Sequence, residues 1–105
     1  MAFTVTPESG DTRTATVRLA GELDMSTVPV LDTAITQLVG TGRNRLVVDL
    51  AELAFCDSTG LACLVRGDNR CAADGGWLRV TNHRGHVARV LAVSGLDEFL
   101  QYEAP

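Results

Sequence analysis

A polar quartet, Asp57-Ser58-Thr59-Gly60, interrupts an apolar run in the segment AELAFCDSTGLACLV over residues 51–65. An acid and two adjacent hydroxyls at such a position can play two roles. Asp57 or Ser58 can cap a following helix by accepting a hydrogen bond from a free backbone amide. A serine that follows a core strand also lies at the edge of the sheet, where α/β proteins usually meet ligands and partners. Taken alone, the residues favour the cap and leave the second role open.

The catalytic alternatives for these residues are weak. Hydrolases place a serine between strand and helix in a Gly-x-Ser-x-Gly turn, but Cys56 stands two residues before Ser58, so half of that pattern is missing. His83 and His86 have no cysteine or carboxylate at metal-ligand spacing beside them. The chain also has no phosphate-loop or dinucleotide-binding glycine pattern. We therefore expect solvated loop histidines, no metal and no cofactor, in a protein that binds rather than an enzyme.

Composition bounds the class of protein. The chain of 105 residues is long enough for one domain with a real core. Its net charge is −4, and the nine basic residues are arginines scattered from Arg13 to Arg89, which argues against direct nucleic-acid binding. No apolar run approaches the ~18 residues that cross a bilayer, and the start, MAFTVTPESG, does not resemble a secretory signal. Three cysteines without a CxxC pair, Cys56, Cys63 and Cys71, indicate small, buried, reduced residues in the cytoplasm.

The elements that must position the quartet follow from hydrophobic periodicity. Alternating residues predict strands over 3–6 and 15–21, joined as an antiparallel pair by a turn. From Ser26 the spacing becomes helical; Ser26 or Thr27 can cap that helix, Pro29 fits its first turn, and GTG at 40–42 ends it. The remaining elements are expected as a strand at 45–50, a helix from Ser58 to about Asp74, a strand at 77–81, a helix at 86–93 and a short strand at 98–102.

The resulting order, β-β-α-β-α-β-α-β, implies right-handed crossovers and a largely parallel sheet. A second polar segment, GELDMST at 21–27, also joins a strand to a helix. In a parallel sheet the two helix N-termini share one end of the molecule. We therefore expect Asp24 and Asp57 to flank Ser58 and Met25 there.

Several segments together resemble one family. GELD at 21–24, VVDLAELAFCDSTGLACLV at 47–65, GGWLRVTN at 75–82 and VARVLAVSGLDEF at 87–99 closely resemble the STAS domain, named for sulphate transporters and anti-sigma factor antagonists. The resemblance covers essentially the whole chain, 1–105. It implies an α/β fold: a single STAS-like domain with a mixed, mostly parallel sheet and helices mainly on one face. Relatives usually continue into a C-terminal helix, whereas this sequence stops at QYEAP. Either the helix is absent or the sequence is truncated before it.

The resemblance also implies a regulatory role. In its antagonist branch the unmodified bacterial domain binds an anti-sigma factor that is also a serine kinase, and so frees a sigma factor. The kinase phosphorylates the serine after the Asp of the motif, here Ser58, and a serine phosphatase reverses the modification. Thr59 stands where many members have serine, so a minor second site is possible. The alternative is a STAS subunit of an ABC-type membrane transport complex, which needs no phosphorylation. In either case we expect no membrane insertion.

The expected partner-binding surface is the shared end of the two helices. Its predicted residues come from the two polar segments and the following helical turn: Asp24, Met25, Ser26, Asp57, Ser58, Thr59 and Leu61.

Overall fold

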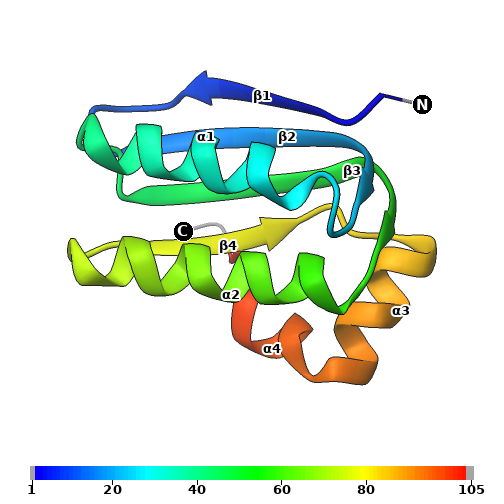
Figure 1. The fold of residues 1–105 in the computed structure, drawn as a ribbon. Helices are drawn as coiled ribbons and strands as arrows, with labels where there is room; N and C mark the ends of the chain where they lie inside the picture. Colours follow the sequence, from blue (N-terminus) through cyan, green and yellow to red (C-terminus); the bar gives the residue numbers. More distant parts are fainter. Residues whose placement is uncertain (1, 104–105) are drawn as a thin grey trace.

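The fold is built on a sheet of four strands in the order β1-β2-β3-β4 (Figure 1). A computed structural model describes residues 2–103, without the side chain of Ser9. β1 (Thr4–Ser9) pairs antiparallel with β2 (Thr14–Leu23). β2 pairs in parallel with β3 (Arg45–Cys56), which pairs in parallel with β4 (Trp77–Thr81). The expected mixed, mostly parallel sheet is therefore confirmed, and its strands β1 to β3 are longer than the sequence predicted.

Two long helices lie side by side over one face of the sheet, α1 (Val28–Gly40) and α2 (Ser58–Ala73) (Figure 1). Two shorter helices follow β4, namely α3 (Gly85–Ser94) and α4 (Leu96–Leu100). The strand β2 shows why one face is covered, because it alternates buried and less buried residues along its length. Besides Gly21, its buried residues belong to the hydrophobic core: Ala15, Val17, Leu19 and Leu23.

A polar contact joins α2 to the edge strand β4. Asp68 of α2 is buried, and its Oδ1 accepts a hydrogen bond from the backbone N–H of Leu78 at 3.0 Å and from Nη1 of Arg79 at 2.9 Å. A buried carboxylate is stable only when its oxygens are satisfied in this way. Sequence periodicity gave no sign of this contact, which fixes α2 along the sheet and so helps to place its N-terminus.

The predicted last strand, over 98–102, is wrong. The chain forms α4 instead, and only Gln101 makes a single parallel bridge, to Val80. Leu96 and Leu100, four residues apart, both pack into the core, which is a helical spacing. Gly95 adopts φ 77, the left-handed conformation that ends a helix and that glycine takes without strain. A segment of about one helical turn is too short for its hydrophobic periodicity to distinguish a helix from a strand.

The helices of residues 2–103 include none that is long and apolar enough to cross a membrane.

Candidate functional site

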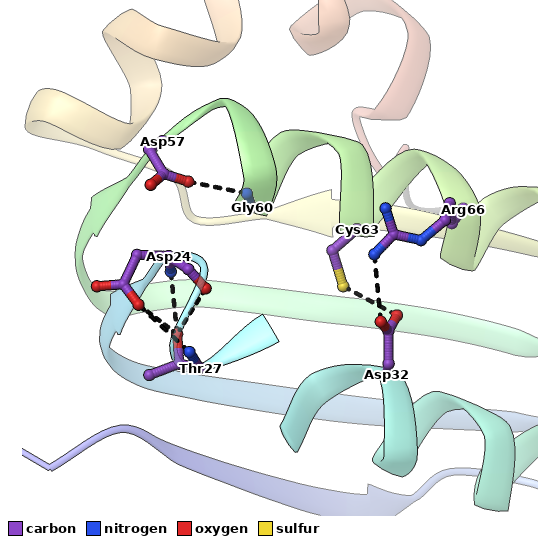
Figure 2. Close-up of polar contacts among 7 residues, drawn as sticks. All are labelled: Asp24, Thr27, Asp32, Asp57, Gly60, Cys63 and Arg66. Carbon is purple, nitrogen blue, oxygen red and sulfur yellow. Dashed lines mark hydrogen bonds and ion pairs between the residues drawn. The ribbon is translucent and has the colours of Figure 1, made fainter. Parts of the chain in front are cut away.

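The quartet and the segment GELDMST meet at one end of the sheet. β2 and β3 are parallel, so the loops after both strands lie at the same edge and lead into α1 and α2 (Figure 1). The backbone N–H of Asp57 donates to the carbonyl oxygen of Leu23 at 3.3 Å, which joins the two loops directly. Figure 2 shows Asp24 and Asp57 at this shared end. The structure thus brings together the seven residues that the sequence selected, and their role in binding stays a prediction.

Asp57 is the N-cap of α2. Its Oδ1 accepts a hydrogen bond from the backbone N–H of Gly60 at 3.0 Å (Figure 2). It accepts a second from the hydroxyl of Thr59 at 2.6 Å. The bond from Thr59, followed by that from Gly60, holds the pKa of the Asp57 carboxyl below its usual range. The carboxylate is thus ionised at neutral pH and interacts favourably with the positive end of the helix dipole.

Ser58 differs from its neighbours Asp57 and Thr59 in its hydrogen bonding. It is the first residue of α2, its side chain is exposed, and its hydroxyl makes no hydrogen bond to any described residue. The cap that the sequence assigned to Asp57 or Ser58 therefore belongs to Asp57 alone. Substitution of Ser58 should not incur the loss of a cap. The hydroxyl is left available for chemistry.

Gly60 fixes how closely this turn approaches the sheet. A Cβ atom added at this buried position would meet the Sγ of Cys56 at 2.8 Å and both the Cγ and the carbonyl oxygen of Leu23 at 2.9 Å. Only glycine allows this approach. The glycine of the quartet therefore serves the packing of α2 against the end of β2.

The β2–α1 loop is held by Asp24 and Thr27 (Figure 2). Oδ1 of Asp24 accepts from the Ser26 hydroxyl at 2.6 Å and from the Ser26 backbone N–H at 3.0 Å. The hydroxyl of Thr27 accepts from the backbone N–H of Asp24 at 2.9 Å and donates to the carbonyl of Glu22 at 2.8 Å. Neither Ser26 nor Thr27 caps α1 through its side chain, contrary to prediction; Thr27 is the N-cap residue, but its hydroxyl is used within the loop. The bond from the Ser26 hydroxyl lowers the pKa of the Asp24 carboxyl.

Met25 and Leu61 provide the apolar part of the predicted surface. The side chain of Met25 is 77% exposed at the tip of the β2–α1 loop. Leu61 is half-buried, one helical turn after Asp57, and packs against the core. An exposed, flexible apolar side chain such as that of Met25 can fill a pocket on a partner.

The sequence did not identify the side of the site formed by α3. A groove of about 510 Å³ lies between α2 and α3. Its lining residues are Ser58, Leu61, His86, Arg89, Val90, Val93 and Ser94. His86 lies in the first turn of α3, in the helix predicted over 86–93, and its exposed ring stacks on Phe55 with a centroid distance of 5.0 Å. Val93 is 84% exposed. The only signal in the sequence was the absence of acidic residues in GHVARVLAVS, a segment that is polar on one face.

The three cysteines are buried and free. Burial raises the pKa of Cys56 and of Cys63 to about 12 and that of Cys71 to about 11. Such thiols stay protonated at neutral pH and are poor nucleophiles and metal ligands. No group of three or more His, Cys, Asp or Glu side chains in the described part of the chain is arranged to hold a metal ion.

One cysteine also links the two long helices. The thiol of Cys63 donates to Oδ1 of Asp32 at 3.2 Å, and Arg66 forms an ion pair with Oδ2 of the same carboxylate at 3.2 Å (Figure 2). This contact between α1 and α2 sets the distance between the two N-termini that carry the site.

These features define a class of small α/β domains. The sheet has an antiparallel edge strand, two helices cover one face, and the polar site lies at the carboxyl ends of β2 and β3. The chain belongs to the STAS domain family, since the family model described as "Mlab, STAS domain" matches residues 8–102.

Individual relatives agree with this assignment. The chain is 30% identical over 88 residues to the anti-sigma-B factor antagonist of Bacillus subtilis. The aligned region covers 84% of this chain and 80% of that protein. It resembles the crystal structure of an anti-sigma factor antagonist from Mycobacterium paratuberculosis with a TM-score of 0.84 and 29% identity, over 98% of this chain and 87% of that one. The Bacillus protein SpoIIAA in its phosphorylated form shares the fold, with a TM-score of 0.74 and 23% identity over 97% of this chain and 92% of that one.

Proposed function

We propose that this chain is a cytoplasmic anti-sigma factor antagonist whose binding to an anti-sigma factor is switched off by phosphorylation of Ser58. The observation that carries the proposal is the exposed hydroxyl of Ser58 at the start of α2, left without a hydrogen bond to the described residues while Asp57 and Thr59 are bonded to each other. The relatives from Bacillus subtilis and Mycobacterium paratuberculosis, both named as antagonists, support the same class.

The chemical step requires a kinase and ATP. The Oγ of Ser58 attacks the γ-phosphorus of ATP, the bond from that phosphorus to the β–γ bridging oxygen breaks, ADP leaves, and the serine proton passes to a base of the kinase. The anti-sigma factor is proposed to be this kinase. A serine phosphatase reverses the step by hydrolysis to serine and inorganic phosphate. This chain supplies only the hydroxyl and its position and is not itself an enzyme.

The fold should accept the modification. A phosphate adds about −1.5 to −2 charges at neutral pH, and at the first residue of α2 it meets free amides and the positive end of the helix dipole. The shared fold of the phosphorylated Bacillus neighbour is consistent with a STAS domain that stays folded in that state.

The interface with the anti-sigma factor should not accept it. The surface around Ser58 already contains the ionised carboxylates of Asp24 and Asp57, whose pKa values are lowered by hydrogen bonds. A phosphate beside them adds like charge to a surface that a docked partner must desolvate. A loss of ~3 kcal/mol, on the order of a hundredfold in affinity, suffices for switching when the partner concentration is near its dissociation constant.

The test combines mapping and binding. Incubation with the anti-sigma factor kinase and ATP should add one phosphate, mapped by mass spectrometry to Ser58. Ser58→Ala should resist phosphorylation, bind the anti-sigma factor and keep wild-type stability, because Asp57 rather than Ser58 caps α2. Ser58→Asp should bind less well than wild type but better than the phosphoprotein, because it adds one charge rather than nearly two.

A matched control adds the same charge elsewhere. Thr12→Asp places a carboxylate in the exposed β1–β2 turn, before β2 begins and hence at the opposite end of the sheet, so its binding should be unchanged. Ser58→Asp that is folded by circular dichroism and binds like wild type contradicts the electrostatic account. Phosphate on Thr59 alone contradicts the site. Co-purification of a transporter ATPase with the unphosphorylated chain supports the transport-subunit alternative instead.

A further inference from the structure

The groove between α2 and α3 places a basic side chain across from Ser58. Its wall contains the apolar side chains of Leu61, Val90 and Val93, and Arg89 lines the same groove as Ser58. Arg89 is exposed and forms no ion pair with any residue of the described part of the chain. Within the described residues, neither the guanidinium of Arg89 nor the hydroxyl of Ser58 has a partner. The proposed partner-binding surface does not include Arg89.

The charges around Ser58 are divided between two sides. Asp57 precedes it on α2, and Asp24 lies in the adjoining loop, so the side toward α1 is acidic. On the other side, α3 carries His86 and Arg89 and contains no acidic residue. The ring of His86 is held in place by its stacking on Phe55. A dianionic group on Ser58 is thus repelled from the acidic side and attracted toward α3.

We propose that a phosphate on Ser58 is bound within the molecule by Arg89 of α3, across the groove between α2 and α3. This inference rests on the phosphorylation of Ser58 proposed above and extends it. The planar guanidinium presents paired N–H donors that match phosphate oxygens, and charge-assisted hydrogen bonds of this type are stronger than neutral ones. The long side chain of arginine can reach toward α2 while its stem lies on the apolar wall.

This contact gives phosphorylation a second consequence. A phosphate bridged to Arg89 covers the groove and withdraws Leu61, Val90 and Val93 from any partner that packs there. The modification then acts by closing an apolar surface as well as by adding charge. In this arrangement Ser58→Asp is an incomplete mimic, because a carboxylate at that position is shorter than a phosphoserine and has one oxygen fewer with which to bind the guanidinium.

The test measures the protonation of the phosphate itself. Phosphoserine is installed at position 58 by translation with an expanded genetic code, so that no kinase is needed, and the second pKa of the phosphate is followed by 31P NMR. A nearby cation favours the dianion, whereas Asp24 and Asp57 oppose it. The pKa in Arg89→Gln should therefore be higher than in the otherwise wild-type phosphoprotein, by about half a unit.

The control removes the same charge at a distance. Arg13 precedes β2 and lies at the other end of that 10-residue strand from the site. The separation is on the order of 30 Å, well beyond the Debye length of ~10 Å at ordinary salt. The phosphate pKa in Arg13→Gln should equal that of the parent phosphoprotein. The phosphate should also raise the melting temperature more, or lower it less, in the parent than in Arg89→Gln.

Two results would overturn the inference: equal phosphate pKa values with and without Arg89, or equal shifts from Arg89→Gln and Arg13→Gln. Because the phosphoserine is installed by translation, neither result depends on whether a kinase modifies Ser58. Failure of the kinase assay would reject the proposed switch while leaving the measured contact with Arg89 intact.

Discussion

Gly60→Ala tests whether the close approach of α2 to the end of β2 builds the site. In the first turn of a helix, alanine in place of glycine should gain up to ~1 kcal/mol of helix propensity. At Gly60 the added methyl would meet the carbonyl oxygen of Leu23 at 2.9 Å, and a strand backbone cannot move aside as the end of a flexible side chain can. It would also meet the Sγ of Cys56 at 2.8 Å. Overpacking of this kind costs ~1–3 kcal/mol.

The net expectation is a loss of up to ~2 kcal/mol in the free energy of unfolding after the full propensity gain of ~1 kcal/mol is subtracted. For a domain of this size that corresponds to a fall in Tm of up to about 10 °C. Thermal melts and urea unfolding by circular dichroism measure both quantities. Gly40→Ala is the matched control, since a Cβ at this last residue of α1 meets nothing within 4 Å; it should leave stability unchanged or raise it slightly.

Partner binding supplies a second readout of the same substitution. If the methyl pushes α2 away from Leu23, the bond between Asp57 and the β2 carbonyl lengthens and the two loops separate. Affinity for the anti-sigma factor should then fall in Gly60→Ala at a temperature where the variant is still folded, and it should not fall in Gly40→Ala. Equal melting temperatures for the two variants would refute the reasoning, because they would show that the approach of α2 has room for a methyl group.

Three further outcomes follow from the site and the core. Met25→Asp should reduce affinity for the anti-sigma factor about tenfold or more without lowering Tm, since Met25 is 77% exposed; a variant that unfolds or that binds normally would show that this surface is misplaced. Cys71→Ala should cost roughly 1 kcal/mol of stability, and Cys63→Ala should cost more, because it also removes the donor to Asp32. Purified wild-type protein should contain no stoichiometric zinc. Zinc that is bound by the wild type and lost in these variants would contradict a purely structural role of the cysteines. The lowered pKa of Asp57 means that its stabilising effect is present above the unfolded pKa, near 4, and is lost as pH falls toward the folded value. Asp57→Asn should therefore be less stable than wild type at pH 7 but lose less stability between pH 5 and pH 2.5, as measured by urea unfolding, and parallel pH curves would exclude this role of the carboxylate.

The sheet and the two long helices could be predicted because their signals are local and sustained. The near-continuous apolar run RLVVDL marks a central strand, and the helical spacing of Leu31 and Ile35 marks the buried face of α1. Short segments could not be treated in the same way. The five residues of α4 contain little more than one helical period, so tertiary contacts of Leu96 and Leu100 decide their conformation.

The caps show a second limit of sequence reasoning. Several oxygen-bearing side chains stand at each helix start, and composition does not say which one accepts the free amide. In α2 the choice is Asp57, and the Ser58 hydroxyl bonds to none of the described residues. In the loop before α1, the hydroxyl of Thr27 is used by Asp24 and Glu22, so no side chain caps the helix. These choices depend on the exact path of each loop.

The contribution of α3 could not be predicted because it depends on where the chain goes after β4. Helices α1 and α2 follow the parallel strands β2 and β3, so their N-termini lie together at the carboxyl edge of the sheet. Because β4 is parallel to β3, α3 starts at the same edge, but no crossover sets the direction in which it packs, since it is followed by another helix rather than a strand. Its position beside the quartet gives the site a basic, partly apolar side that the two polar loops lack. A serine with acids on one side and, on the other, an arginine that forms no ion pair within residues 2–103 has a preferred direction for any negative charge it acquires. A change at Ser58 can therefore reach the groove through the domain's own charges, in addition to its direct effect on a partner.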